Sequence, residues 1–440
     1  MRITTRSHPT ARSRTRLTAA GLAALLGTSL LAGCADDSGD DGKDGKVTVS
    51  IGVFGVFGYK QAGLYDEYEK LHPNVTIKEN STQNLKDYYP ALLTHLSTGS
   101  GLQDIQAIEV NNIAEIKQLA DKFVDLSNAP GVKKSNFLSW KWNQATTEDG
   151  KTIGLGTDIG PLAVCYRKDL FEKAGLPTDR EEVGKLWAGD WNKYLEVGKE
   201  YTKNAPEGTS FLDTGGSLFN GYISGSPERY YNKQGEPIYK DSPGVKQAWQ
   251  LAMDAIEGGM TAKITLFDKA WQQALANGTF ASTVCPAWML GQIKEYAGEK
   301  NADKWDVAAA PRSGNWGGSF LAVPTASQNR EEAMKLAAWL TAPEQQAKLF
   351  AAQAQFPSSQ AAYELDQVKN HTDAYFSDAP VGPLFSEAAR DVPNLVLGPK
   401  DQLIGETIVN VGVAQVEQQG KSPQQGWEAA VKSIDNALDQ

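Results

Sequence analysis

Histidine and glycine patterns in the sequence give little support for catalysis or for a bound cofactor. The four His residues are scattered, and no two have the spacing of a metal-binding pair. Neither a GxSxG nucleophile motif nor a phosphate loop of the form GxxxxGK followed by Ser or Thr occurs. The segment GLGTDIG at 154–160 approaches a dinucleotide fingerprint, but its third Gly comes one residue late and no helix opens within it. We therefore expect no metal, no nucleotide and no other cofactor.

Aromatic residues, in contrast, stand where they could bind a solute. The chain has 11 Trp among 440 residues, and several aromatics lie beside Gly, Pro, Asn or a carboxylate in predicted loops. A flat ring packs on the apolar C–H face of a pyranose, and Asp, Asn and Glu side chains bind its hydroxyls. Such a pocket is apolar overall with a few polar groups. The stretches concerned are FGVFGY at 54–59, WKWNQ at 140–144, CPAWML at 285–290 and NWGGSF at 315–320.

Each aromatic also has an interpretation as a core residue. For Trp288 and Trp316 both a core position and a binding position stay open. Trp140 and Trp142 are equally open, because alternate positions on a strand would place both on one side. The Trp residues that fall on predicted helical stripes are expected in the core: Trp249, Trp271, Trp339 and Trp427.

The N-terminal segment predicts export and a lipid anchor. Residues 1–16 contain five Arg and no acid, and the apolar run 17–31 follows, which is typical of a secretory signal peptide. That run is shorter than the roughly 20 residues of a spanning helix. Because residues 31–34, LAGC, resemble a bacterial lipobox, we expect a signal peptide over 1–33 and an acylated Cys34. An ordinary signal peptide with an unrelated Cys is the alternative. Residues 34–46, rich in Asp and Gly, predict a flexible tether.

The charge and length of the mature chain limit its partners. Residues 34–440 carry 38 Lys and Arg against 53 Asp and Glu, a net charge of −15, which argues against a nucleic-acid partner. No later stretch is apolar for long enough to cross a bilayer. The mature length suits two domains of ordinary size.

Two further cysteines, Cys165 and Cys285, are expected to form a disulfide, because an exported protein matures in an oxidising environment. The bond would close a loop of about 120 residues and stabilise the fold by up to roughly 4 to 5 kcal/mol in the chain-entropy model. Two buried thiols are the alternative.

Hydrophobic periodicity predicts alternating strands and helices. Residues 47–54 predict a strand, a helix with Leu64, Tyr68 and Leu71 on one face follows, and a second strand lies near 75–78. The same alternation returns in the second half of the chain, which ends in a helix capped by Ser422 and Gln425. We therefore expect an α/β fold in which each of two units is a mainly parallel sheet flanked by helices.

Four longer motifs carry a resemblance to a known family. Residues 47–440 resemble the solute-binding proteins of bacterial ABC importers, family 1, in the oligosaccharide-binding group of the maltodextrin-binder type. The family often has Tyr-Asn where this chain has Tyr166-Arg167, which leaves the expected fold unchanged. The motifs are FGVFGYKQAGLYDEYEKLHPNV, DGKTIGLGTDIGPLAVCYRKDLFEKAGLP, ALANGTFASTVCPAWMLG and WGGSFLAVPTASQNREEAMKLAAWL.

The resemblance implies a two-lobed periplasmic-binding-protein-like fold of type II, joined by a hinge that the chain crosses several times. One lobe is expected over 47–137 plus 320–355, and the other over 138–319 plus 356–440. Both lobe cysteines then belong to the second lobe. The resemblance also implies a sugar in the cleft and a closure that presents both lobes to the membrane permease subunits. It further implies a monomer without catalytic activity on the extracytoplasmic face of the cell membrane.

The same resemblance implies that the ligand-binding residues lie at strand ends and at hinge crossings. Aromatic rings are expected to stack on sugar rings, while carboxylates and an amide bind hydroxyls. Alternatively, Asp158 caps a turn and Glu109 is a solvated strand end. The stacking residues are Phe57, Trp142, Trp288 and Trp316, the hydroxyl-binding residues are Glu109, Asn111 and Asp158, and Tyr59 and Gly317 complete the expected site.

The combination of VFGYKQAGLY with WGGSF looks like binders of short β-1,4-linked xylo- or cello-oligosaccharides. A lipid-anchored glycoside hydrolase is an alternative, since it too needs aromatics and a pair of carboxylates. Glu109 and Asp158 are its only candidates, and the expected lobes place them on opposite sides of a hinge, which is poor preorganisation. A binder of a non-sugar solute, such as a peptide or a polyamine, is the third possibility.

Overall fold

The computed structural model describes residues 45–439. The predicted signal peptide, the predicted anchor Cys34 and nearly all of the predicted tether lie outside these residues. Within the described part of the chain, no helix combines the length and the hydrophobicity needed to cross a membrane.

Five strands form the first sheet, in the order β2-β1-β3-β10-β4. β1 pairs in parallel with β2 and β3, whereas β10 is antiparallel to β3 and β4. Residues of β1 alternate between the two faces, as the period of two requires. The strands are β1 (Val47–Phe54), β2 (Val75–Thr82), β3 (Ile105–Glu109), β4 (Leu155–Gly156) and β10 (Ser319–Ala322).

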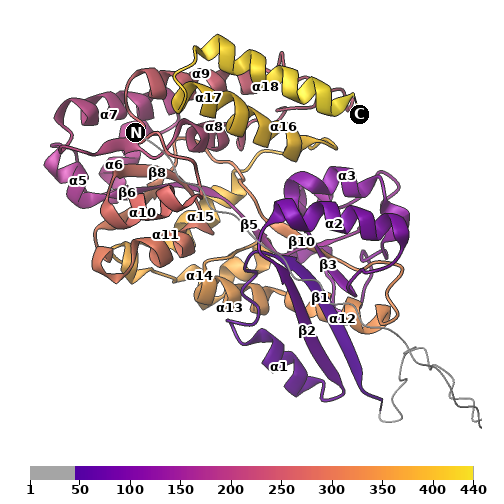
Figure 1. The fold of residues 1–440 in the computed structure, drawn as a ribbon. Coiled ribbons are helices and arrows are strands. Elements are labelled where there is room, and N and C mark those ends of the chain that lie inside the picture. Colours follow the sequence, from indigo (N-terminus) through magenta and orange to yellow (C-terminus); the bar gives the residue numbers. More distant parts are fainter. Residues whose placement is uncertain (1–44, 440) are drawn as a thin grey trace, which may run out of the picture. The chain divides into compact units, whose positions relative to one another are not determined.

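Helices cover both faces of this first sheet (Figure 1). On one face, α1 (Leu64–Leu71) and α12 (Arg330–Leu340) pack against the inward side chains of β1. On the other face, α2 (Leu85–Thr98) and α3 (Ile113–Lys117) pack against β3 and β10. The sheet is therefore the middle layer of an αβα sandwich, as the alternating pattern predicted.

Four strands form the second sheet, in the order β7-β8-β6-β9. β6 is antiparallel to both β8 and β9, and only β7 and β8 run in parallel. The strands are β6 (Leu162–Arg167), β7 (Ser210–Leu212), β8 (Phe280–Pro286) and β9 (Trp305–Ala309). One face is covered by α5 (Lys168–Lys173), α6 (Arg180–Trp187) and α7 (Trp191–Asn204), and the other by α10 (Lys269–Asn277), α11 (Met289–Ala297) and α15 (Val381–Arg390).

The predicted fold class is confirmed, since both sheets are flanked by helices on two faces. The sheets are more mixed than the mainly parallel ones that we predicted. β8 and β9 reach β6 from the opposite direction, so the strand pairing reverses there. Cys165 on β6 and Cys285 on β8 are buried and form a disulfide between these two strands.

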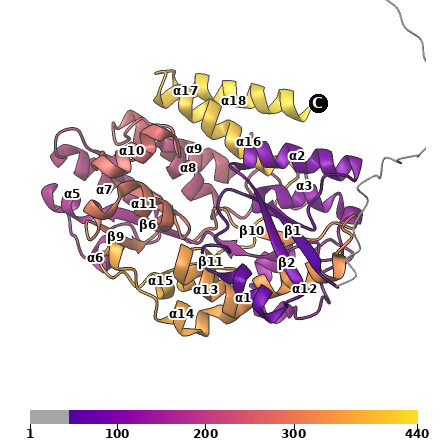
Figure 2. The same ribbon diagram turned by 60° about the horizontal axis from the view of Figure 1, so that its bottom comes forward.

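A layer of helices from distant parts of the chain packs beside the second sheet (Figure 2). The last helix begins with the predicted capping box, in which the Ser422 hydroxyl accepts from the Gln425 N–H and the Gln425 side chain accepts from the Ser422 N–H. The members of the layer are α8 (Gly215–Ile223), α9 (Pro243–Glu257), α16 (Asp401–Thr407), the π-helical turn Ile408–Val413, α17 (Ala414–Glu417) and α18 (Pro423–Leu438).

Three stretches of chain run between the two sheets. The first links β4 to β6 through β5 (Asp158–Ile159), and the second links β9 to β10 over residues 310–318. The third continues from α13 (Pro343–Gln353) into β11 (Phe356–Pro357), which pairs with β5. All three stretches therefore lie side by side near Asp158.

A short helix, α4 (Ser139–Gln144), joins the two cores. The strand that we considered for Trp140 and Trp142 is wrong, because this segment is helical. Residues two apart on a helix are separated by about 200° around its axis. Trp140 accordingly packs in the core beside the second sheet, and Trp142 packs in the core of the first.

We predict that the disulfide is a main source of stability. Replacing both Cys165 and Cys285 with Ala should lower the free energy of unfolding by about 4 kcal/mol, because the bond closes a loop of 120 residues in the unfolded chain. Urea unfolding with and without a reducing agent measures this. An unfolding midpoint that is the same in the double variant and the oxidised wild type would contradict the prediction.

Candidate functional site

Three aromatic rings from separate segments form a cluster at one end of the second sheet. Trp288 precedes α11, Trp316 lies on the stretch between β9 and β10, and Phe267 lies before α10. The ring centroids are 6.0 Å apart for Trp288 and Trp316, 5.9 Å for Phe267 and Trp288, and 6.3 Å for Phe267 and Trp316. Both Trp side chains are half-buried. The cluster therefore combines packed edges with ring surface that a ligand can reach.

Trp316 is held by its backbone. Its N–H donates to the Gly160 carbonyl at 2.9 Å, and its own carbonyl accepts from the Trp288 indole N–H at 2.8 Å. A Cβ on Gly160 would lie only 1.9 Å from the Trp316 carbonyl oxygen, so only glycine allows this close approach. Asn315 completes the frame, since its Oδ1 accepts from the Gly160 N–H and its Nδ2 donates to the Gly317 carbonyl.

Phe267 is the member of the cluster that sequence reasoning missed. Its side chain is 41% exposed, although it is large and apolar. Its φ of 66° lies in the left-handed region, which is rare for a bulky residue and is typical of functional segments. Its single sequence signal was an aromatic in a segment without helical or strand periodicity, which is too weak to single it out.

A polar group lies at the carboxyl end of β3, next to the antiparallel strand β10. Glu109 ends the strand, and one of its carboxylate oxygens accepts from the backbone N–H of Asn111 at 2.6 Å. The Asn111 Oδ1 accepts from the Arg229 guanidinium at 2.8 Å. Glu109 and Asn111 are half-buried, so the protein orients both side chains and leaves part of each accessible.

Asp158 and Lys141 connect this polar group to the aromatic cluster. The Asp158 carboxylate accepts from the Thr157 hydroxyl at 2.7 Å and from the Ser319 N–H at 3.0 Å. Lys141 comes from α4, is fully buried, and holds its ammonium 3.8 Å from the centre of the Phe320 ring. Its Nζ makes no hydrogen bond within the described residues. The sequence shows Lys141 only as a Lys between the two Trp residues of WKWNQ, and its burial follows from packing against Phe320 on β10.

The electrostatics of the polar group follow from its burial. Burial raises the pKa of Glu109 to about 7, opposed by the Asn111 N–H and by the charges of Lys141 and Arg229. Burial also lowers the pKa of Lys141 to about 8, opposed by Asp158 and Glu109. The half-buried Glu109 carboxylate can bind a hydroxyl of a neutral ligand as a charge-assisted partner, whereas the buried Lys141 ammonium acts on the site through its charge.

The structure thus brings together most of the residues that sequence analysis proposed for the site. Asp158 and the Trp316–Gly317 turn lie on two neighbouring stretches, because a Cβ on Gly318 would lie 2.5 Å from the Asp158 carbonyl oxygen. Glu109 pairs with Ser319 on β10 and so joins the same region. Gly317, at φ 89°, leaves room for the Trp288 indole, from which an added Cβ would be only 3.0 Å away.

Three residues that we expected in the site lie instead in or against the core of the first sheet. Trp142 is only 5% exposed and packs against Phe137 in the core of the first sheet, which favours a structural role. Tyr59 is fully buried in the same core. Phe57 is half-buried beside Phe54 and Tyr59, at ring-centroid distances of 5.2 and 6.0 Å. Of the three, Phe57 alone keeps accessible ring surface.

Comparison with known proteins identifies the family. Residues 63–375 match the family described as bacterial extracellular solute-binding protein. The chain belongs to this family. Its members are binding proteins rather than enzymes, which removes the hydrolase alternative for Glu109 and Asp158. Within the described residues, no three His, Cys, Asp or Glu side chains are grouped so that they could hold a metal ion.

Solved structures resemble the solute-binding protein over most of its length. An extracellular solute-binding protein of family 1 is 41% identical, covers 89% of this chain and 99% of its own, and superposes with a TM-score of 0.80. An ABC-transporter-associated binding protein from B. animalis subsp. lactis, solved with β-1,6-galactobiose, is 20% identical over 89% of this chain and 98% of its own, with a TM-score of 0.74. The two-lobed fold of these neighbours is therefore shared.

A curated relative matches a smaller part of the solute-binding protein. The arabinooligosaccharide-binding protein of Halalkalibacterium halodurans is 21% identical over 304 residues, which are 65% of this chain and 66% of the relative. The chain thus spans just under two thirds of the length of that relative.

We predict that Glu109 makes the ligand-free protein less stable as the pH rises. The folded-state pKa of about 7 lies above the ordinary value of 4.5. The stabilising contribution of the protonated carboxyl is therefore complete below about pH 4.5 and is lost as the pH rises through about 7. Urea unfolding at pH 5, 6, 7 and 8 should show the wild type losing more than about 1 kcal/mol relative to Glu109→Gln, since one pKa unit is about 1.4 kcal/mol.

The control for this titration is Glu148→Gln, which removes a carboxylate from an exposed position. Its stability should follow that of the wild type across the same pH series. A constant difference between the wild type and Glu109→Gln from pH 5 to pH 8 would contradict the assigned environment of Glu109.

Proposed function

We propose that the protein binds a short oligosaccharide between its two sheets and delivers it to the permease of an ABC importer. The observation that carries this proposal is the cluster of Phe267, Trp288 and Trp316 beside Asp158. Half-exposed rings next to fixed carboxylates suit a ligand with apolar ring faces and hydroxyl edges. A peptide or a polyamine would gain less from stacked rings.

The contacts that we propose divide by chemistry. Trp288, Trp316 and Phe267 stack on sugar rings, with Phe57 as a further ring from the first sheet. Glu109, Asp158 and Asn111 bind hydroxyls. Micromolar affinity corresponds to about −8 kcal/mol, which a few stacks and several charge-assisted hydrogen bonds can supply.

The names of related proteins support a saccharide and leave the linkage open. One relative is an arabinooligosaccharide-binding protein, and one neighbour was solved with β-1,6-galactobiose. For this chain we propose β-1,4-linked xylo- or cello-oligosaccharides, on the motifs VFGYKQAGLY and WGGSF. These motifs contribute Phe57 and Trp316, two of the proposed stacking rings.

The proposed setting is the extracytoplasmic face of the cell membrane. The family description is extracellular, and we propose that Cys34 carries the lipid and that residues 34–46 form the tether. The protein then works as a monomer whose two lobes both face the permease.

The lobes that we propose follow the two sheets. The sequence-based division places 47–137 with 320–355 and 138–319 with 356–440. Because β4 pairs with β10 in the first sheet, we propose that the first crossing follows Gly156. The disulfide then lies within one lobe and leaves the relative movement of the lobes free.

A calorimetric series tests the proposed function. Xylobiose, cellobiose, maltose, raffinose, an arabino-oligosaccharide and β-1,6-galactobiose should be titrated into the mature protein, and at least one should bind in the micromolar range. The β-1,4-linked disaccharides are expected to bind most tightly. Binding of none of them, with no change in melting temperature, would overturn the proposal.

Trp316→Ala tests the stacking role directly. We expect the affinity for the best ligand to fall at least tenfold, because one stacked ring is lost. Trp427→Ala is the matched control, since Trp427 is also half-buried but lies on α18 against Trp249. Equal affinities in the wild type and Trp316→Ala would remove Trp316 from the site.

A further inference from the structure

Arg229 is a buried cation that no motif pointed to. It lies between α8 and α9, in a segment that forms a parallel bridge between Glu228 and Val396 and is closed by the Val396 N–H donating to the Pro227 carbonyl. Gly398 packs against the Tyr231 ring so closely that a Cβ there would lie 1.9 Å from the ring. The local backbone therefore has little freedom, and the Arg229 side chain leaves it in a defined direction.

The guanidinium contacts two polar side chains from different parts of the chain. The Arg229 Nη2 donates to the Asn111 Oδ1 at 2.8 Å and forms an ion pair with an Asp401 carboxylate oxygen at 3.0 Å. The Arg229 and Asp401 side chains are 6% and 0% exposed. The second Asp401 oxygen accepts from the Gly398 N–H at 3.0 Å. Asp401 thus fixes Arg229, and Arg229 reaches Asn111.

The chemistry of the pair determines how the Asn111 amide is oriented. Arg has five N–H donors and no acceptor, so the amide atom that faces it must be the oxygen. The amide NH₂ group then points away from Arg229, and its Nδ2 lies 3.4 Å from a Glu109 oxygen. One amide N–H thus donates to Glu109, and the second amide N–H lies beside the remaining acceptor capacity of the Glu109 carboxylate, which together form the pairing that one sugar hydroxyl needs.

A second contact holds the same two segments together. Lys400, the neighbour of Asp401, forms an ion pair with Glu115 on α3, and the Tyr89 hydroxyl donates to the other Glu115 oxygen at 2.9 Å. Leu397 packs beside the core under α2 and α3. Figures 1 and 2 both place α16 next to these helices, in agreement with its contact to the turn Val110–Asn112.

We propose that Arg229 is a positioning residue that orients the Asn111 amide toward the ligand, and that Asp401 holds it in place. This proposal rests on the proposed saccharide-binding function. It also explains why a buried ion pair stands beside the site, where an apolar pair of similar volume would serve stability equally well. Removing Arg229 is therefore expected to lower the ligand affinity as well as the free energy of unfolding.

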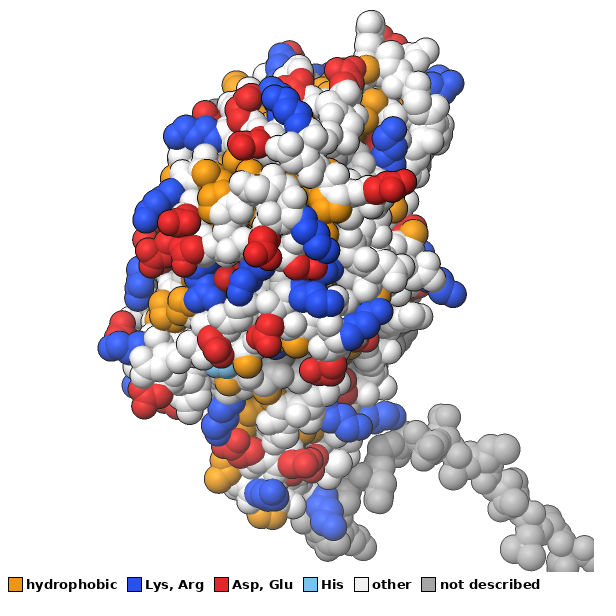
Figure 3. Space-filling view, turned by 90° about the vertical axis from the view of Figure 1, so that its left-hand side faces the viewer, with side chains coloured by type: hydrophobic (Ala, Val, Ile, Leu, Met, Phe, Trp, Pro, Cys, Tyr) orange, Lys and Arg blue, Asp and Glu red, His pale blue; other side chains and the backbone are white. Residues whose placement is uncertain are grey.

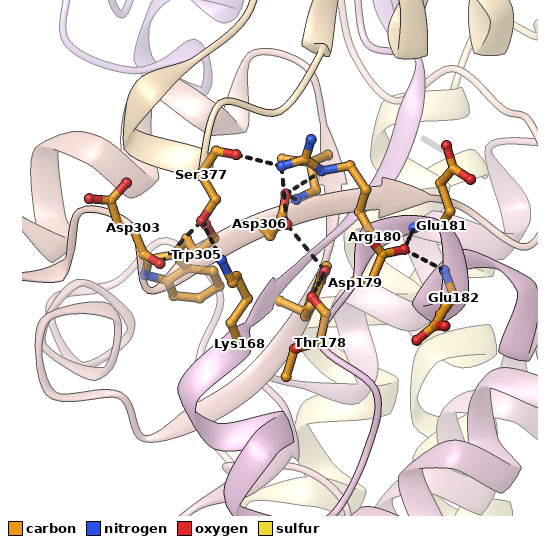
Figure 4. Close-up of polar contacts among 12 residues, drawn as sticks. Lys168, Thr178, Asp179, Arg180, Glu181, Glu182, Asp303, Trp305, Asp306 and Ser377 are labelled. Atoms are coloured by element: carbon orange, nitrogen blue, oxygen red, sulfur yellow. Dashed lines mark hydrogen bonds and ion pairs between the residues drawn. The ribbon is translucent and has the colours of Figure 1, made fainter.

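The chain offers a matched control in another ion pair (Figure 4). Arg180 on α6 donates to the Asp306 carboxylate at 2.9 Å and to the Ser377 carbonyl at 2.5 Å. The Arg180 and Asp306 side chains are 25% and 4% exposed. This pair links α6 to β9 and makes no contact with the candidate site, so Arg180→Met should lower stability without changing ligand affinity.

The first test is a double-mutant cycle measured by calorimetry with the best ligand of the series. Arg229→Met and Asn111→Ala should each weaken binding about tenfold, and the double variant should be no more than about twofold weaker than Asn111→Ala alone. Arg180→Met should bind within twofold of the wild type. Arg229→Lys and Asp401→Asn, which keep the side-chain volume, replace Arg229→Met if that variant does not fold.

Two results of the cycle would overturn the proposal. One is unchanged affinity in the Arg229 variants, and the other is a double variant whose loss equals the product of the two single losses. In both cases a wild type that binds saccharide leaves the proposed function standing.

The second test needs no ligand and so separates this proposal from the proposed function. The side-chain NH₂ resonances of Asn111, assigned by their loss in Asn111→Ala, should shift in Arg229→Met or Arg229→Lys and stay in place in Arg180→Met. Resonances that keep their positions in the Arg229 variants would overturn the proposal, whether or not any saccharide binds.

Discussion

The close approach of two chain stretches around Asp158 is the constraint on which the rest of the site depends. Hydrogen bonds join the segment 157–161 to the segment 315–319: the Gly160 N–H donates to the Asn315 side chain, the Trp316 N–H to the Gly160 carbonyl, and the Ser319 N–H to the Asp158 carboxylate. Because these bonds connect a β5 residue with the residues that lead into β10, they fix both the carboxylate and the Trp316 ring in one frame. The glycines at 160, 317 and 318 make the approach possible, since a side chain there would collide with backbone or with Trp288.

The site also shows how a binding surface can be built from groups that are costly to bury. Lys141, Arg229 and Asp401 lie at positions with little access to water, and Glu109 is half-buried beside Asn111, which contacts Arg229. Arg229 is paired with Asp401, and the charges of Asp158 and Glu109 act on Lys141. Lys141 nevertheless has no hydrogen-bond partner among the described residues. Burying an ammonium without hydrogen-bond partners costs free energy, which is why the pKa of Lys141 is lowered to about 8.

The sequence predicted the fold class, the first βαβ unit and the capped last helix, because these follow from local periodicity and capping chemistry. The resemblance to a known family, rather than any local pattern, implied that Trp288, Trp316, Gly317 and Asp158 belong to one site, and the structure places them close together. Sequence analysis missed Phe267, Lys141 and Arg229. Lys141 and Arg229 owe their roles to contacts with residues more than a hundred positions away, as in Arg229 with Asn111, and no local pattern encodes those. Phe267 meets Trp288 and Trp316, which lie on separate segments that only the fold brings together. The strand expected at Trp142 is a helix in the structure, because the short segment WKWNQ is compatible with both and only packing decides.

The helix that carries Lys141 has a mechanical consequence. Trp140 packs in the core beside the second sheet and Trp142 packs in the core of the first. If α4 moved together with one sheet, the indole that packs against the other sheet would have to leave its place in that core. A rotation of one sheet against the other therefore requires either that one of these indoles shifts within its core or that the backbone bends at α4 itself.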